Sequence, residues 1–170
     1  LLATAFLVGT WLALREARRL RLDEDRVVTL ILVVLVAGVL GARALYVIEH
    51  LGDFRGSYLS VLTLWQGGLT LYGGIVGGIV AGLLVAQRLK LPRWTTADAL
   101  APSIALGTAF GRVGCFLNGC CYGRPTSQPW GVVFPPDSFA GLAYGTQPLH
   151  PAQLYFSAAG LGVFLLAWGR

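Results

Sequence analysis

Residues Val27–Ile48 read VVTLILVVLVAGVLGARALYVI, an apolar run with one charged side chain, Arg43. About 20 consecutive apolar residues allow a helix to cross the hydrocarbon core of a bilayer. The whole chain has this character, since 55% of its 170 residues are hydrophobic and 12% are charged. A soluble domain carries roughly 25% charged residues. The composition therefore argues against a soluble protein and favours an integral membrane protein.

Further apolar runs, separated by polar segments, predict five helical spans. Because lipid permits only helices or closed barrels, and these runs are too long for barrel strands, we expect an all-α polytopic transmembrane helix bundle. The predicted spans are Leu1–Ala17, Val27–Ile48, Leu69–Arg88, Thr96–Asn118 and Pro151–Trp168.

The basic residues are concentrated in alternate gaps between these spans. They are Arg15, Arg18, Arg19, Arg21 and Arg26 at the end of the first span and after it, Arg88, Lys90 and Arg93 at the end of the third and after it, and Arg170 at the end of the sequence. This distribution follows the positive-inside rule for membrane proteins and places the Asp53 and Cys121–Leu149 loops on the outer face. It explains the net charge of +5 without a nucleic-acid partner, and we expect none.

The segment Gly111–Thr126, GRVGCFLNGCCYGRPT, places Arg112 at membrane depth. A charge there is costly and usually faces a protein interior or a polar cavity. Its guanidinium offers a fork of donors that suits phosphate. The alternative is an internal salt bridge to Asp98 or Glu49, but Asp98 lies about 21 Å away along one helix at 1.5 Å per residue. Arg43 is a second candidate anion ligand, although Glu49 or Asp53 could neutralise it.

The three cysteines, Cys115, Cys120 and Cys121, have a spacing that lacks the CxxC pattern of zinc sites, and both histidines are distant in sequence. We therefore expect no metal site. A disulfide on an oxidising outer face, or simple packing of small polarizable side chains, are the alternatives.

Glycines form small-residue ridges in two predicted spans, where they would let helix backbones come close. The third span carries Gly73, Gly74, Gly77, Gly78 and Gly82, and the fourth carries Gly107, Gly111 and Gly114. Helix packing alone could explain them. The functional interpretation is a contact between these two spans at the level of Tyr72 and Arg112. Tyr72 could also be an interfacial anchor, and His150 a hydrogen-bonded structural residue.

Four blocks occur in order along the chain: GARALY (Gly41–Tyr46), WQGGLTLYGGIVGG (Trp65–Gly78), GRVGCFLNGCCYGRPT (Gly111–Thr126) and HPAQLY (His150–Tyr155). They resemble the GxRxxY, Trp-glycine, GRxGNFxNxExxGRxT and HPxQLYE motifs of the bacterial prolipoprotein diacylglyceryl transferase family. The resemblance implies a single integral-membrane transferase domain over residues 1–170, truncated at both ends. It also implies a multi-pass protein of the bacterial cytoplasmic (inner) membrane with its active site toward the outer face.

The resemblance implies that a diacylglyceryl group passes from phosphatidylglycerol to the lipobox cysteine of a prolipoprotein signal peptide at the lipid bilayer. A thioether forms, glycerol-1-phosphate leaves, and no cofactor is required. Arg112 would bind the phosphate, and Asn118 would orient the headgroup. Glycines would allow close backbone approach, and Arg43 would assist binding. These glycines are Gly73, Gly74 and Gly123. The base is left open by the residues themselves: His150 or Tyr72 would serve, or none is needed.

Four positions depart from the family pattern. Better-known members carry His where Tyr72 stands, Asn where Cys115 stands, and Glu where Cys120 and Phe156 stand. A mechanism that relies on those groups is therefore not expected here. The alternatives are a related membrane transferase with another lipid donor or acceptor, using Cys120 or Cys121, and a non-enzymatic lipid-binding membrane protein.

Overall fold

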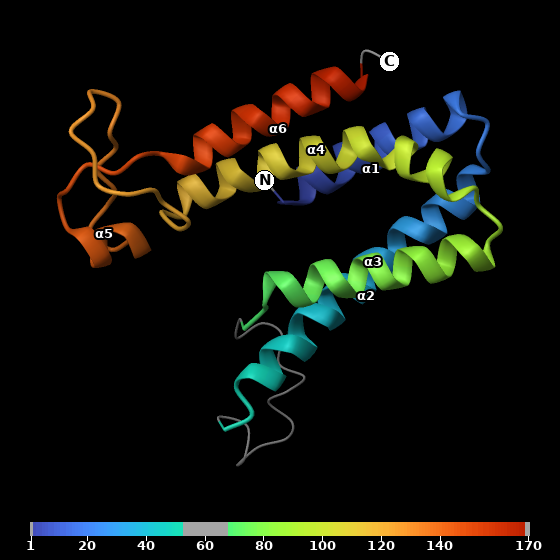
Figure 1. Ribbon diagram of the computed structural model, residues 1–170, viewed down its shortest axis with the longest axis horizontal. Helices are drawn as coiled ribbons and strands as arrows, with labels where there is room; N and C mark the ends of the chain where they lie inside the picture. The colour runs from blue at the N-terminus through green and yellow to red at the C-terminus, as the bar shows by residue number, and fades with distance from the viewer. Residues whose placement is uncertain (1, 53–67, 169–170) are drawn as a thin grey trace. The chain divides into compact units, whose positions relative to one another are not determined.

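The computed structural model describes residues 2–52 and 68–168, and its regular secondary structure is helical throughout these ranges (Figure 1). The helices are α1 (Leu2–Arg19), α2 (Glu24–Glu49), α3 (Leu71–Arg88), α4 (Arg93–Leu117), α5 (Phe139–Tyr144) and α6 (Ala152–Trp168). Contacts divide the chain into two units, Ala17–Ala97 and Leu1–Glu16 with Asp98–Arg170. The predicted all-α fold is confirmed.

Long helices occupy all five predicted spans, but fewer of them meet the length and composition of a membrane-crossing helix. Within the described residues, three helices are long and apolar enough to cross a membrane, namely α2, α3 and α4. Helix α6 is apolar but has 17 residues. Helix α1 ends in a charged segment that includes Arg18 and Arg19. The chain is thus a helical membrane protein, and by these criteria three of the five predicted spans qualify within the described residues.

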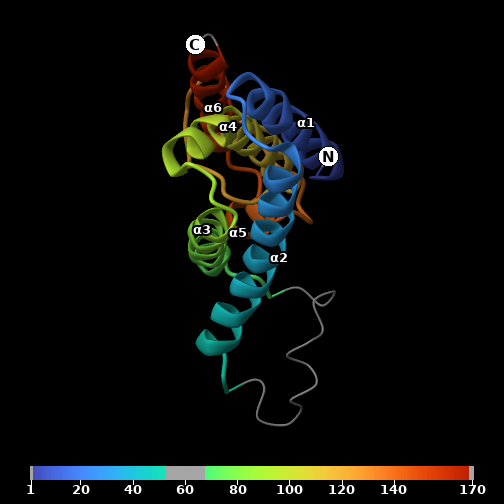
Figure 2. The same cartoon turned by 90° about the vertical axis from the view of Figure 1, so that its right-hand side faces the viewer.

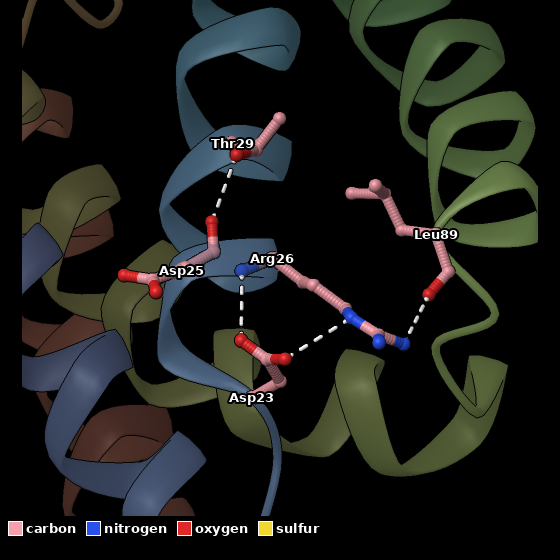
Figure 3. Close-up of polar contacts among 5 residues, drawn as sticks. All are labelled: Asp23, Asp25, Arg26, Thr29 and Leu89. Carbon is pink, nitrogen blue, oxygen red and sulfur yellow. Dashed lines mark hydrogen bonds and ion pairs between the residues drawn. The ribbon is translucent and has the colours of Figure 1, made fainter.

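The start of α2 is tied to the end of α3 by one arginine (Figure 3). The Asp23 carboxylate caps α2 by accepting the backbone N–H of Arg26 at 3.3 Å, and it accepts the Arg26 Nε–H at 3.1 Å. Arg26 Nη1 also donates to the carbonyl oxygen of Leu89 at 2.9 Å, directly after α3 ends. The Arg26 guanidinium therefore bonds both to the capping carboxylate at the start of α2 and to a backbone carbonyl just after α3. Helix ends generally need such partners for their unpaired backbone groups.

Helices α2 and α3 lie side by side in both views, and their backbones touch through small residues (Figures 1 and 2). A Cβ on Gly73 would overlap the carbonyl oxygen of Gly41, and a Cβ on Gly77 would lie 2.6 Å from that of Ala37. Membrane helices associate largely through close van der Waals packing, because lipid provides no hydrophobic driving force between them. Small residues at a crossing permit this close packing. The ridge of α3 thus has its partner on α2.

In the other unit, α4 packs against α6 through alanine and glycine. The Ser157 hydroxyl of α6 donates to the carbonyl oxygen of Ala109 at 3.0 Å. A Cβ on Gly160 would lie 3.2 Å from the Ala105 carbonyl oxygen. The predicted ridge of Gly107, Gly111 and Gly114 does not make this contact, since a Cβ on any of them would meet no described atom within 4 Å.

A structured loop connects α4 to α6, as predicted. Its centre is a small core of Phe134, Ala140 and Leu149, which are all buried. Its one helix, α5, has six residues and is capped by Ser138, whose hydroxyl accepts the Gly141 N–H at 3.0 Å. The loop therefore holds the end of α4 and the start of α6 in a defined relation.

Candidate functional site

Arg112 lies on α4 with its guanidinium over an aromatic ring of α6. Its Cζ atom is 4.9 Å from the centroid of the Phe156 ring. Among the described residues of its own unit, none forms a hydrogen bond or ion pair with Arg112, so the predicted alternative of a salt bridge to Asp98 does not occur there. Glu49 belongs to the other unit, and its pairing with Arg112 stays a prediction. A cation–π contact orients a guanidinium but leaves its N–H donors unused. The geometry therefore leaves the charge of Arg112 available for an anionic ligand.

The start of α6 carries a second candidate group. His150 Nδ1 lies 3.0 Å from the hydroxyl oxygen of Tyr155. The Gly123 N–H donates to the carbonyl oxygen of His150 at 3.0 Å, and a Cβ at position 123 would lie 2.8 Å from His150 Cβ. Only glycine lets the chain pass this close. The structure thus brings together Gly123 and His150, and Tyr155 is followed directly by the Phe156 that supports Arg112.

Helix α4 ends in a Schellman motif, which fixes the backbone conformation of the residues that follow the helix. Gly119 adopts a left-handed φ of +63°. Its N–H donates to the Phe116 carbonyl oxygen, and the Cys120 N–H donates to that of Cys115, both at 3.1 Å. This pair of bonds defines the motif, and glycine is favoured at its left-handed position. Asn118 is exposed at the turn, and its carboxamide bonds to no other described residue.

The same turn gathers the cysteines. The Sγ atoms of Cys115, Cys120 and Cys121 all lie within 4.8 Å of one another, and the last two are 3.8 Å apart. All three are free thiols. The prediction from spacing missed this cluster, because it compared the cysteines with CxxC patterns. The signal that could have found it is Gly119, because a Schellman motif folds the residue after the glycine back over the last helical turn.

Gln153 of α6 hydrogen-bonds to the backbone of the cysteine cluster. Its side chain is fully buried, and Nε2 donates to the Cys120 carbonyl oxygen at 2.7 Å. Its Oε1 atom has no hydrogen-bond partner among the described residues. A buried amide oxygen without a partner costs about 1–3 kcal/mol, so its environment is a polar site that is incompletely satisfied.

The remaining predicted site residues belong to the unit that holds α2 and α3. Arg43 is 7% exposed, and its Nη1 donates to the Gly68 carbonyl oxygen at 3.0 Å. Gly68 has a φ of +77°, and a Cβ there would lie 2.8 Å from Arg43 Nη1. Arg43 therefore holds the segment that leads into α3. Its predicted role in substrate binding stays a prediction.

On α3, Gly73 is buried against Gly41, and this packing explains why the position holds glycine. A Cβ on Gly74 would have more space. Tyr72 is 73% exposed at the start of the helix. Tyr72 and Arg112 belong to different units, and their predicted contact stays a prediction. Trp65–Gly67 of the quoted glycine block lie outside the described residues.

Comparison with known proteins decides the family. A sequence model described as prolipoprotein diacylglyceryl transferase matches residues 1–170. The chain belongs to this family. A relative from Thermosynechococcus vestitus, named phosphatidylglycerol–prolipoprotein diacylglyceryl transferase, is 37% identical over 166 residues, which are 98% of this chain and 62% of the relative. A Bordetella bronchiseptica protein of the same name is 40% identical over 146 residues, 85% of this chain and 52% of its own length.

A third relative, from Clostridium perfringens and named phosphatidylglycerol–prolipoprotein diacylglyceryl transferase 2, is 32% identical over 172 residues, 100% of this chain and 66% of the relative. The chain spans about three fifths of the length of the first such relatives, 62% and 59%. The family resemblance that the four sequence blocks indicated is therefore confirmed.

Proposed function

We propose that this chain is part of a membrane transferase that moves a diacylglyceryl group from phosphatidylglycerol to the lipobox cysteine of prolipoproteins. The observation that carries the proposal is Arg112, an arginine within a helix long and apolar enough to cross a membrane, whose guanidinium has no ion-pair partner among the described residues of its unit. A charge at such depth is retained where function needs it. The names of the family and its relatives give the chemistry that this charge would serve.

The reaction generates negative charge on the donor's phosphate. The acceptor thiolate attacks the diacylglyceryl carbon that bears the phosphate oxygen, forming the S–C bond as the C–O bond breaks. The electron pair of that bond stays with the phosphate, so glycerol-1-phosphate leaves with one more negative charge than the phosphodiester had. Arg112 would stabilise that growing charge more in the transition state than in the ground state, and only such differential interactions raise the rate.

Other residues would orient the donor. The exposed carboxamide of Asn118, one turn and a half after Arg112, can hydrogen-bond the glycerol headgroup. Gly74 on α3 would allow lipid to approach the backbone. Gly73 and Gly123 are closed off by Gly41 and His150, so their predicted part in the site would be to allow this close packing. Arg43 would assist binding or position the segment before α3. The positive-inside pattern supports an active site toward the outer face of the cytoplasmic (inner) membrane.

The acceptor thiol must lose its proton, because the thiolate is the nucleophile. His150 can accept it in one tautomer. When Nδ1–H donates to the Tyr155 hydroxyl oxygen, Nε2 keeps a free lone pair for the thiol proton. Tyr72 is the second candidate base, but a phenol has a pKa near 10 and is a weaker choice at neutral pH. The proposal therefore assigns the base to His150.

The test uses the full-length protein in membranes, phosphatidylglycerol labelled in its glyceryl group, and a lipobox peptide. We expect label to pass to the peptide, and a peptide with serine in place of the lipobox cysteine to receive none. Arg112→Ala should lower transfer by about 10³-fold, whereas Arg88→Ala, which removes an equal charge from the C-terminal end of α3, should retain it. Absence of transfer by the unaltered protein would refute the proposed function.

A further inference from the structure

We propose that Cys115, Cys120 and Cys121 form a three-thiolate site for a soft divalent cation, Zn²⁺, whose fourth position receives the acceptor thiol. The site would activate that thiol directly, so the inference rests on the proposed transferase function. It replaces the expectation from sequence that the chain has no metal site. Three observations carry it: the sulfur geometry, the support behind it and its position beside Arg112.

The sulfur atoms are already spaced for a metal. A Zn–S bond of about 2.3 Å in a tetrahedral site places the sulfur atoms about 3.8 Å apart. Cys120 Sγ and Cys121 Sγ are 3.8 Å apart, and Cys115 Sγ lies within 4.8 Å of both. Cys115 Sγ is therefore at most about 1 Å beyond the sulfur spacing of a tetrahedral zinc site. The Schellman motif at Gly119 fixes the backbone that presents Cys115 and Cys120 to each other.

The surroundings of the cluster resemble the outer shell of a metal site. Metal ligands are usually held by a further layer of hydrogen bonds, and loss of that layer typically weakens metal affinity by 10–100-fold. Here the buried Gln153 donates to the Cys120 carbonyl oxygen at 2.7 Å. Its Oε1 atom is the buried acceptor without a described partner. Gln153 therefore fixes the backbone of Cys120, one of the three proposed ligands.

Three ligands leave one position open, which is typical of catalytic rather than structural zinc. A thiol that coordinates zinc is deprotonated outright. On binding, the lipobox S–H would release its proton to water or to His150, and the sulfur would keep its electron pair. That sulfur would then form the S–C bond as the phosphate leaves with the electron pair of the C–O bond. Zinc undergoes no redox change, so the step needs no oxidant or reductant.

The site lies where the donor phosphate is expected. Arg112 and Cys115 are three residues apart on α4, and side chains at this spacing share a helix face with Cβ atoms about 5–6 Å apart. A thiolate on the metal and a phosphate on the arginine would therefore be neighbours. This is the relation that attack on the carbon next to the phosphate oxygen requires.

A first experiment measures the metal without any transfer. The full-length protein is purified in detergent under reducing conditions, freed of metal and titrated with Zn²⁺, and with Co²⁺ as a coloured substitute. We expect one ion per chain, with sulfur-to-cobalt charge-transfer absorption and protection of all three thiols from alkylation. Cys115→Ser, Cys120→Ser and Cys121→Ser should each weaken binding by at least tenfold, whereas Arg112→Ala should bind normally. No binding, or an unchanged affinity in the serine variants, would overturn the proposal.

A second experiment tests the open position. A lipobox peptide should intensify the charge-transfer band of the cobalt-loaded protein by adding a fourth sulfur, and the same peptide with serine should leave it unchanged. This readout does not require phosphatidylglycerol, so it separates failure of the metal site from failure of the proposed transfer. An unchanged spectrum with the cysteine peptide, or full transfer activity in Cys120→Ser, would overturn the role in thiol activation. A Cys120–Cys121 disulfide in the protein isolated without reductant, with no metal uptake after reduction, would overturn the site.

Discussion

Substitution of Gly73 and of Gly74 by alanine should separate helix packing from substrate contact. The two glycines are neighbours on α3, and both are candidate site residues. A Cβ on Gly73 would overlap the Gly41 carbonyl oxygen of α2 and lie 2.6 Å from Leu45 Cβ. A Cβ on Gly74 would lie 3.3 Å from the Gly38 carbonyl oxygen, which a small adjustment can accommodate. Gly73→Ala must therefore push two backbones apart, and Gly74→Ala need not.

The expected difference follows from this geometry. Forcing a methyl group into a closed contact typically costs about 1–3 kcal/mol. Replacing glycine by alanine within a helix returns up to about 1 kcal/mol, but this gain is the same for both variants and cancels between them. We therefore expect Gly73→Ala to be less stable than Gly74→Ala by about 1–3 kcal/mol. Gly74→Ala itself should unfold with a free energy close to that of the unaltered protein.

The assay is unfolding of the full-length protein in mixed micelles by increasing SDS, followed by circular dichroism, with transfer activity measured on the same samples. A stable Gly74→Ala variant with reduced transfer would support contact between Gly74 and substrate. Equal unfolding free energies for the two variants would refute the packing account of Gly73, because the described contacts then would not govern stability.

Three further predictions concern the other unit. Arg112→Ala should lower kcat/KM for phosphatidylglycerol by about 10³-fold, because a unit charge at 4 Å and an effective dielectric of 20 contributes about 4 kcal/mol; Arg112→Lys should lose less in the same labelled-lipid assay. Gly119→Ala should lower the thermal unfolding temperature, because Gly119 has a φ of +63° and an added Cβ would lie 2.6 Å from Ser138 Cβ. The same variant should weaken Co²⁺ binding by the cysteines. Tyr155→Phe should reduce kcat by about tenfold, which is less than the roughly 10²-fold loss expected when a general base is removed completely. The KM for phosphatidylglycerol should not change, and the pH profile of kcat should be altered.

Much of the helical architecture could be predicted from the sequence, because hydropathy and charge act locally along the chain. The start of α4 could not be placed as well. Thr96 was expected to begin it, yet α4 begins at Arg93, and both the N–H and the hydroxyl of Thr96 donate to the Pro92 carbonyl oxygen. A threonine hydroxyl can bond back to the carbonyl four residues earlier, so threonine alone does not mark a helix start.

The partners of the small residues were harder to predict than their existence. Spacing shows that α3 has a face of small residues, but the choice of α2 as its partner depends on Gly41 and Ala37 being at matching heights. Likewise, the glycines of α4 suggested a crossing, whereas Ala105 and Ala109 make its contact with α6. Pattern identifies a helix face, and the packing partner depends on tertiary geometry that a single sequence does not contain.

Three of the four departures from the family pattern share one feature, which is the replacement of acid–base side chains by other groups. Where better-known members carry His and Glu, this chain has Tyr72, Cys120 and Phe156, so it lacks one imidazole and two carboxylates at these positions. Phe156 also leaves Arg112 with a ring beneath it rather than a carboxylate, which keeps its full positive charge for the phosphate. A metal-bound acceptor thiol needs no strong base. The thiol cluster, which contains Cys120, would therefore supply the activation that the missing acid–base groups no longer provide.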